Sequence, residues 1–498
     1  MIAFDQIKTL GAVLISVAIG ASFGPGLNGC SDQSAQMETA LASLGFDFYR
    51  LSERGRREIG RFSAVFQEYA ADPENTRQLK HFRDAYKRIS DAYVDDLPDG
   101  KLIEAAVQGV KAQNPKPHSL PAAQLVEFAL DAMTAALDPH SAYLNPEELH
   151  ESELVTSGEF GGLGIQITQQ DGLIKVIAPI EGTPAERAGI KTGDLITHID
   201  GVSVRGMSLK DAVNTMRGQP GTKVELTLQR DGRSPMRLSV GRAIITIEPV
   251  RWFVEGDIAY TRVVGFNEKA AQRLEEALSD LRAHHPHLAG LVLDLRNNPG
   301  GLLDQSVAIA DAFLDNGLIV KIRGRQAASE RGFPAEPGDL VAGLPIVVLI
   351  NAGSASAAEI VAAALGDNGR ATVMGSTSFG KGSVQTIMRL PEGGALKLTT
   401  ALYYSPSGSQ IQARGITPRI QLLPAKDKDA EQEPHEVDLP GALPARDPVR
   451  QMAETSVDTQ MCPPVGPTKD REIGCAMAYL KAGSTDRFLA AIKAQPRL

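Results

Sequence analysis

The sequence has few cysteines and no excess of basic residues. Its 498 residues include three cysteines, and no two of them have the Cys-x2-Cys spacing common in zinc sites. The formal net charge is −9, and lysine and arginine form no long cluster. Because neutralising phosphates requires a basic face, we expect no nucleic acid among the partners. We also expect neither a metal nor another cofactor.

Long apolar runs are equally scarce, and the one clear run lies at 9–21. It is short for a membrane span and suits the core of a signal peptide within 1–30, so we expect an exported, periplasmic protein. Leu-Asn-Gly-Cys at 27–30 resembles a lipoprotein box, which makes Cys30 a candidate for lipidation and membrane anchoring. A cleaved signal peptide without lipid and an uncleaved N-terminal anchor are the alternatives.

The odd number of cysteines bears on the C-terminal segment. If Cys30 is lipidated or removed, Cys462 and Cys475 remain as a pair. Because exported compartments are oxidising, we expect a disulfide between them. Two buried or free thiols are the alternative.

Helical patterns dominate the region that follows the signal segment, at 31–157. The strongest pattern is at 120–137, where apolar residues recur three and four positions apart and a proline stands early. Asp138-Pro139 then ends the helix. We expect a helical N-terminal region.

A second region, at 158–243, shows short strands and two short helices. Thr-Pro-Ala-Glu-Arg-Ala-Gly at 183–189 opens a helix at its proline and closes it at its glycine, and a Gly-Asp turn and an alternating strand follow. Another short helix is expected at 209–217. This succession resembles a PDZ domain, which binds an extended peptide by strand addition and caps its terminal carboxylate with backbone N–H groups.

The glycine-rich sequence Phe-Gly-Gly-Leu-Gly-Ile at 160–165 fits the carboxylate loop of a PDZ domain. We expect Leu163, Gly164 and Ile165 to bind the free, apolar C-termini of protein or peptide substrates. A glycine-rich turn without a ligand is the alternative. A regulatory adaptor is a further candidate partner.

Strands and helices alternate from 244 to 424. Residues 290–295 and 345–351 are continuous apolar runs, as in strands buried on both faces of a sheet, and each leads through a turn into a helical pattern. We therefore expect a multidomain protein with an α/β core. Residues 425–443 are charged and poor in apolar residues, as in a linker, and 444–498 are expected to form a small helical tail.

Two motifs of the α/β core carry the chemistry. Asn-Ala-Gly-Ser-Ala-Ser-Ala-Ala-Glu at 351–359 places a serine where a strand turns into a helix. Phe-Gly-Lys-Gly-Ser-Val-Gln at 379–385 places a lysine at the glycine-flanked start of a strand. A lysine kept neutral by burial can take the proton of a serine hydroxyl, which is sufficient for acyl transfer without histidine. The pair predicts a serine–lysine protease.

Both motifs resemble those of the carboxyl-terminal processing proteases, also called tail-specific proteases. The resemblance extends to Asp-Leu-Arg-Asn-Asn-Pro-Gly-Gly at 294–301 and to Leu-Asp-Pro-His-Ser-Ala-Tyr-Leu at 137–144. It implies that Ser356 is the nucleophile, Lys381 the base and Gln385 a support that holds the neutral amine by a hydrogen bond. It also implies a crotonase-like core and ATP-independent endopeptidase activity on exported proteins.

An acyl-transfer site also needs N–H groups that stabilise the oxyanion. The N–H of Ala357 is one expected donor, because this residue follows the nucleophile at the start of a helix. By resemblance Gly301 is the second donor, and Gly300 stays an alternative. Ser354 is expected to cap the helix, and Glu359 is expected to be structural.

Two other functional classes compete with a protease. Gly-Ser-Thr-Ser-Phe-Gly-Lys-Gly at 375–382 nearly matches a phosphate-binding loop, but Gly382 replaces the metal-binding hydroxyl and a strand pattern follows instead of a helix. A PDZ-based peptide-binding scaffold with an inactive protease core is the other alternative, and the intact serine, lysine and glutamine argue against it. By resemblance His140 is structural. Arg419 stands where the family usually has aspartate and predicts local rewiring near the end of the core.

Overall fold

The computed structural model describes residues 53–494, apart from 99, 171, 181, 208, 231–233, 247, 327–329, 424–433, 447–451 and 467–468. The chain divides into two units, Met1–Arg57 and Glu58–Leu498, and everything from Glu58 onward belongs to the second. The apolar run at 9–21 and Cys30 lie outside the described residues. Among the described residues, no helix is long and apolar enough to cross a membrane.

The expected helical region begins with helices whose apolar faces are buried. Its members are α3 (Glu53–Tyr69), α4 (Thr76–Ala92), α5 (Lys101–Lys111) and α6 (Ala122–Ala135). Helix α4 starts at Asn75, whose side chain accepts the N–H of Gln78, and it buries Phe82, Tyr86 and Ile89 on one face. Helix α6 packs against both α4 and α5.

The segment after α6 connects this region to the rest of the chain. Strand β1 (Ala142–Leu144) pairs antiparallel with β18 (Ala395–Tyr404) of the α/β core. Helix α7 (Pro146–Thr156) follows, and it starts with a capping box in which Asn145 and Glu148 bond each other's backbone N–H groups.

The region resembling a PDZ domain contains a six-stranded sheet in the order β3-β4-β5-β7-β8, with β6 beside β5. The strands are β3 (Ile165–Gln170), β4 (Leu173–Pro179), β5 (Leu195–Ile199), β6 (Val202–Ser203), β7 (Lys223–Gln229) and β8 (Met236–Gly241). Helices α8 (Pro184–Arg187) and α9 (Leu209–Met216) contribute buried residues to its core. A two-stranded ribbon of β2 (Glu159–Gly162) and β9 (Ala243–Thr246) joins the entry and exit of this region.

The α/β core is built on a seven-stranded sheet in the order β10-β11-β12-β15-β16-β19-β20. Its strands are β10 (Val250–Glu255), β11 (Ile258–Val263), β12 (Gly290–Asp294), β15 (Ile346–Ile350), β16 (Ala371–Gly375), β19 (Ile420–Leu423) and β20 (Thr455–Asp458). All neighbouring pairs are parallel except β10 with β11. Every residue of β12 and β15 is buried, as their continuous apolar sequences predict.

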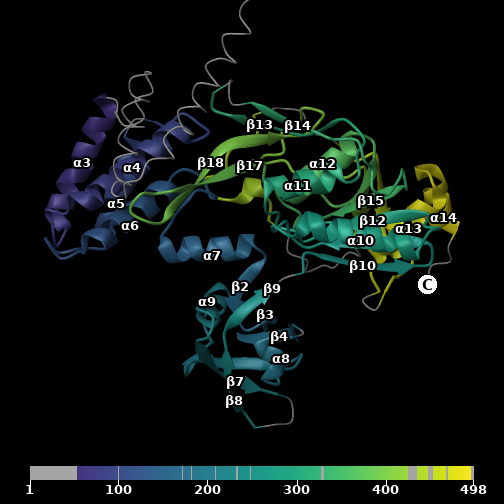
Figure 1. The fold of residues 1–498 in the computed structure, drawn as a ribbon, viewed down its shortest axis with the longest axis horizontal. Helices are drawn as coiled ribbons and strands as arrows, with labels where there is room; N and C mark the ends of the chain where they lie inside the picture. Colours follow the sequence, from purple (N-terminus) through teal and green to yellow (C-terminus); the bar gives the residue numbers. More distant parts are fainter. Residues whose placement is uncertain are drawn as a thin grey trace, which may run out of the picture. The chain divides into compact units, whose positions relative to one another are not determined.

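A second, antiparallel sheet belongs to the same core. It contains β1 and β18 together with β13 (Leu318–Gly324), β14 (Arg331–Pro334) and β17 (Ser383–Arg389). The core helices are α10 (Ala270–His284), α11 (Leu303–Asp311) and α12 (Ala357–Asp367). Helices α11 and α12 contact β13 as well as each other, and α12 also contacts β16, so both lie between the two sheets (Figure 1).

The opposite face of the seven-stranded sheet is covered by α13 (Arg471–Ala482) and α14 (Thr485–Ala494). Along β12, Leu291 and Leu293 face the cluster of α10, α11 and α12, whereas Val292 faces the cluster of α13 and α14. The C-terminal segment therefore completes the core and supplies its strand β20, which the expectation of a helical tail did not include. Cys462 and Cys475, which the sequence predicts to pair, are joined by a disulfide.

Leu480 of α13 should contribute strongly to stability because it fills the space above β12. Its side chain is buried, and a Cβ on Gly290 would lie 2.9 Å from it. Leu480→Ala should lower the free energy of unfolding by about 2–5 kcal/mol, measured by urea denaturation. Leu423→Ala, at a position that is 43% exposed, is the matched control and should change it by less than about 1 kcal/mol. Equal effects at both positions would contradict this packing.

Candidate active site

Ser356 stands at the junction between β15 and α12, where it is the N-cap residue of the helix. Its φ is +54°, a left-handed value that non-glycine residues seldom adopt, so the surrounding structure must hold it there. The residue is only 8% exposed, and buried residues surround it on both sides in the sequence. A serine fixed on a strained strand-to-helix turn has the geometry of a nucleophile.

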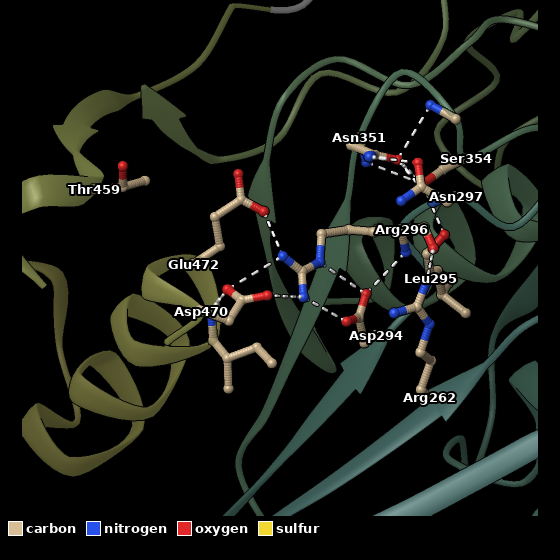
Figure 2. A network of polar contacts seen from close by, with 12 residues as sticks. Arg262, Asp294, Leu295, Arg296, Asn297, Asn351, Ser354, Thr459, Asp470 and Glu472 are labelled. Carbon is tan, nitrogen blue, oxygen red and sulfur yellow. Dashed lines mark hydrogen bonds and ion pairs between the residues drawn. The ribbon is translucent and has the colours of Figure 1, made fainter. Parts of the chain in front are cut away.

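Ser354 does not cap α12, contrary to the expectation from the sequence. Its buried hydroxyl donates to the carbonyl of Leu295 at 2.8 Å and accepts the N–H of Asn351 at 3.0 Å. Asn351 and Asn297 share two more hydrogen bonds, from the N–H of Asn297 at 2.8 Å and from Nδ2 of Asn351 at 3.0 Å. Figure 2 shows these contacts, which join the turn at 351–356 to the turn at 294–301.

The turn at 294–301 approaches Ser356 closely. A Cβ on Gly300 would lie 2.8 Å from the Cβ of Ser356, so only glycine fits there. The N–H of Gly300 donates to Oδ1 of Asn298 at 2.9 Å and is therefore occupied. Within the part of the chain that the structure describes, the N–H groups of Gly301 and Ala357 donate no hydrogen bond. These two groups are available to an oxyanion, whereas that of Gly300 is not.

Lys381 precedes β17 and lies between two glycines that pack against other backbone. A Cβ on Gly382 would lie 2.1 Å from the backbone nitrogen of Gln412. Burial lowers the pKa of Lys381 to about 8, helped by the charge of Lys397 and opposed by three nearby carboxylates. About a tenth of such lysines are neutral at pH 7, far more than at the ordinary lysine pKa of about 10.4.

Glu359, which the sequence suggests is structural, links the two motifs. Its carboxylate is fully buried. One oxygen accepts the N–H of Ser356 at 2.7 Å and that of Lys381 at 2.9 Å, and the other accepts the N–H of Gly380 at 2.7 Å and the hydroxyl of Ser378 at 2.5 Å. Burial raises the pKa of Glu359 to about 7, while these hydrogen bonds favour its charged form. The spacing Ser-x-x-Glu is the sequence signal of the first of these contacts.

Gln385 lies on β17, and hydroxyl groups orient its side chain. Its Nε2 donates to Oγ of Ser383 at 2.9 Å and to Oγ1 of Thr399 at 3.3 Å. Among the described residues, Gln385 has no hydrogen bond to Lys381, and Lys381 has none to the hydroxyl of Ser356. The support of the lysine by Gln385 stays a prediction.

His140, which the resemblance implies is structural, contacts a buried carboxylate. Its Nε2 lies 2.7 Å from Oε2 of Glu436, a residue of the short helix η2 (Glu436–Asp438). The other carboxylate oxygen accepts from Gln412, whose Oε1 accepts the N–H of Gly382 beside the lysine. Glu436 is fully buried although the segment was expected to be a linker. No group of three or more His, Cys, Asp or Glu able to hold a metal occurs among the described residues.

The predicted carboxylate loop precedes β3, and its backbone conformation at position 164 requires a glycine. Gly164 has φ +80°, and a Cβ there would lie 2.3 Å from Thr183. In the described part of the chain, the N–H groups of Leu163 and Gly164 donate no hydrogen bond. Among the described residues, strand β3, which begins at Ile165, pairs with β4 alone, and no described strand pairs with its other edge. An open edge next to unbonded N–H groups is the arrangement needed to add a peptide strand.

Comparison with known families agrees with this geometry. The family model "Peptidase family S41" matches 257–422, which includes both motifs, and a PDZ-domain model matches 175–230. The predicted α/β fold with a PDZ domain is thereby confirmed. The protein is a serine-type peptidase that carries a PDZ domain.

Relatives define the family more closely. A carboxy-terminal-processing protease of Bartonella bacilliformis is 48% identical over 71% of this chain and 78% of its own length. The carboxy-terminal processing protease CtpA of Bacillus subtilis is 35% identical over 68% of this chain and 67% of its own. The solved photosystem II D1 C-terminal processing protease is 30% identical, covers 70% of this chain and 93% of its own, and has a TM-score of 0.46. The chain belongs to the carboxy-terminal-processing protease family.

The close approach between Gly382 and the backbone of Gln412 allows a direct test of how the turn that carries Lys381 is positioned. Gly382→Ala must displace this turn or the backbone at Gln412, and a misplacement of about 1 Å can cost ~100-fold in rate. We expect kcat/KM on labelled casein to fall by about that factor while circular dichroism stays unchanged. Gly241→Ala, where an added Cβ meets no atom within 4 Å, is the control and should keep full activity. Wild-type activity of the Gly382 variant would refute the close approach.

Proposed function

We propose that this protein is an ATP-independent endopeptidase in which Ser356 attacks the scissile carbonyl and Lys381 takes its proton. The observation that carries the proposal is the buried carboxylate of Glu359, one oxygen of which accepts the N–H of both residues. The two motifs are far apart in sequence but share this single acceptor. The lowered pKa of Lys381 makes its neutral form accessible at neutral pH.

The reaction needs one rearrangement of the serine side chain. Among the described residues Lys381 has no hydrogen bond to the hydroxyl of Ser356, so this hydroxyl has to turn to Nζ of Lys381, and such contacts commonly tighten only when substrate binds. As Ser356 bonds to the carbonyl carbon, the N–H groups of Gly301 and Ala357 stabilise the oxyanion. The protonated lysine then gives its proton to the leaving amine, and water releases the acyl group by the reverse route.

Gln385 supports the lysine in this proposal. An amide oxygen can accept a hydrogen bond from a neutral amine without the charge that would raise the pKa of Lys381. Because Ser383 and Thr399 engage its nitrogen, the oxygen is the part of the amide available to the lysine.

The competing classes have less support. The near match to a phosphate-binding loop at 375–382 leads into strand β17, so it lacks the helix N-terminus that would bind phosphate. A peptide-binding scaffold with an inactive core would not need a strained serine or a lysine of lowered pKa. These two features favour an active protease.

Substrate choice is proposed to depend on the PDZ domain. The loop of Leu163, Gly164 and Ile165 would hold the free carboxylate of an apolar C-terminus, and the open edge of β3 would hold the residues before it. A regulatory adaptor could use the same edge. We further propose that the protein acts on exported proteins in the periplasm, with Cys30 or the run at 9–21 as an anchor. The disulfide between Cys462 and Cys475 fits an oxidising compartment.

The pH dependence of activity tests the lysine base. Only neutral Lys381 accepts the serine proton, so kcat/KM should rise with pH through about 8 and then level off, because the active form is the deprotonated one. The measurement is the pH profile on an internally quenched peptide that ends in free Ala-Ala. Lys381→Met and Ser356→Ala should each remove activity by several orders of magnitude, since nucleophile and base act as a unit.

Two controls separate chemistry from stability in this test. Lys381→Met should not lower the melting temperature, because it removes a charge that burial disfavours. His140→Ala should keep the rise of kcat/KM with pH near 8, even if the substitution lowers stability. A limb near pH 6.5 that vanishes with a histidine substitution would contradict the serine–lysine mechanism.

Recognition of a free C-terminus is tested by amidation. With the inactive Ser356→Ala protein, binding of a fluorescent peptide ending in Ala-Ala should weaken at least ~10-fold when its terminus is amidated, because amidation removes the negative charge and an acceptor oxygen. A peptide ending in Asp-Asp with a free terminus should also bind weakly, because the proposed recognition is of apolar C-termini. Fluorescence anisotropy measures the affinity of each of the three peptides. Equal affinities for the free and amidated peptides would rule out this reading of the loop.

A further inference from the structure

The C-terminal segment 455–494, here called the tail, is built into the catalytic sheet. Its strand β20 pairs in parallel with β19, and its helix α13 packs on β12 and β15. Strand β12 leads into the oxyanion turn at 294–301, and β15 leads into the nucleophile turn. The tail therefore lies against the two strands whose ends carry the reacting groups.

One buried arginine joins the tail to the oxyanion turn. Arg296 lies between Asp294, at the end of β12, and two carboxylates of the tail (Figure 2). Its Nη1 contacts Oε2 of Glu472 at 2.6 Å, and its Nη2 contacts Oδ2 of Asp470 at 3.0 Å and Oδ2 of Asp294 at 2.6 Å. Because the guanidinium is a rigid planar fork, carboxylates on both sides fix its position.

The backbone of Arg296 opens the turn that ends at Gly301. Its carbonyl accepts from Nη2 of Arg262 at 3.2 Å, and the next residue, Asn297, has φ +56° and pairs with Asn351. A shift of Arg296 would therefore move the turn and the N–H of Gly301. Oxyanion donors act over a narrow range of about 2.7–3.1 Å, so a small displacement lowers the rate.

The disulfide encloses both tail carboxylates. Cys462 and Cys475 are buried and stand 13 residues apart, and Asp470 and Glu472 lie between them. Asp470 also caps α13, and Arg471 donates to the carbonyl of Cys462 at 2.7 Å. The cross-link thus restricts the start of α13 to the neighbourhood of Arg296.

We propose that Asp470 and Glu472 are positioning residues for the oxyanion turn, acting through Arg296, and that the Cys462–Cys475 disulfide makes this positioning dependent on oxidation. The inference rests on the function proposed above. Reduction by an external dithiol transfers two electrons and two protons to the disulfide, which gives two protein thiols and the oxidised dithiol. The loosened start of α13 then holds Arg296 less firmly.

The test is the double variant Asp470→Asn/Glu472→Gln, which keeps the size of both side chains and a residue able to cap α13. We expect kcat on the quenched peptide to fall about 10–100-fold while KM and the alkaline limb near pH 8 stay unchanged, because Lys381 is untouched. The inhibition constant of a peptide boronate, which binds Ser356 as a tetrahedral adduct, should rise by the factor by which kcat/KM falls. A merely structural role would lower the melting temperature. It would leave kcat per folded enzyme and the boronate inhibition constant unchanged.

Matched variants make the test specific. Glu454→Gln removes a carboxylate of the adjoining segment whose partner, Arg419, is exposed, and it should change nothing. Cys462→Ser/Cys475→Ser, and wild type treated with dithiothreitol, should show the same loss of kcat, whereas dithiothreitol should not slow the Cys462→Ser/Cys475→Ser variant further. If the carboxylate double variant does not fold, Glu472→Gln alone replaces it, because Glu472 caps no helix.

The outcomes separate this inference from the proposed function. Unchanged kcat and unchanged boronate inhibition in the folded carboxylate variant would overturn the positioning role. Unchanged kcat after reduction, with the disulfide shown to be open, would overturn the redox dependence. Activity that survives Ser356→Ala would instead refute the proposed function itself.

Discussion

The hydrogen bonds to the buried carboxylate of Glu359 are the interaction on which the arrangement of the site depends. The carboxylate sits at the start of α12 and accepts backbone N–H groups of Ser356, Gly380 and Lys381. Without this acceptor these three N–H groups would lose their partner, at about 1–3 kcal/mol for each one that is buried. The acceptor therefore favours the one arrangement in which the turn that carries Ser356 meets the turn that carries Lys381.

The seven-stranded sheet holds this arrangement from both faces. Alternate residues of β12 and β15 pack on α10, α11 and α12 or on the tail, so the strand ends that lead to Ser356 and to the turn at 294–301 are supported on each side. Ser354, Asn351 and Asn297 then join the two strand ends to each other. Dense packing of this kind transmits displacements, which is why changes in the tail should reach the oxyanion turn.

The parts that the sequence predicts well are those with a local signal. The apolar run at 290–295 became β12, and the pattern after Ser356 became α12, because burial on both faces and a helix cap leave clear traces in composition and spacing. The pairing of Cys462 with Cys475 was also predicted from the sequence.

The parts that the sequence did not predict depend on contacts between distant residues. Glu359 shows its capping role in the spacing, but its bonds to Gly380 and Lys381 arise only in the fold. Ser354 was predicted to cap α12, and it bonds to Leu295 of another turn instead. Glu436 lies in a charged segment, and its burial follows from its partners His140 and Gln412.

The role of the tail was equally hidden from local patterns. Thr-Ser-Val-Asp at 455–458 has no strong strand pattern and becomes β20 only by pairing with β19. Arg419, which stands where the family usually has aspartate, forms an ion pair with Glu454 just before that strand, and the local rewiring expected there stays a prediction. Such pairings have no signal in a single sequence because they depend on where the sheet edge lies.

The central claim is that Ser356, Lys381 and the N–H groups of Gly301 and Ala357 form one catalytic centre. The most direct measurement is a crystal structure of the protein with a peptide boronate bound. We predict a bond from boron to Oγ of Ser356, a boronate oxygen about 2.7–3.1 Å from both N–H nitrogens, and Nζ of Lys381 about 2.6–3.2 Å from Oγ. An adduct on another residue, or a boronate oxygen directed away from Gly301 and Ala357, would contradict the account.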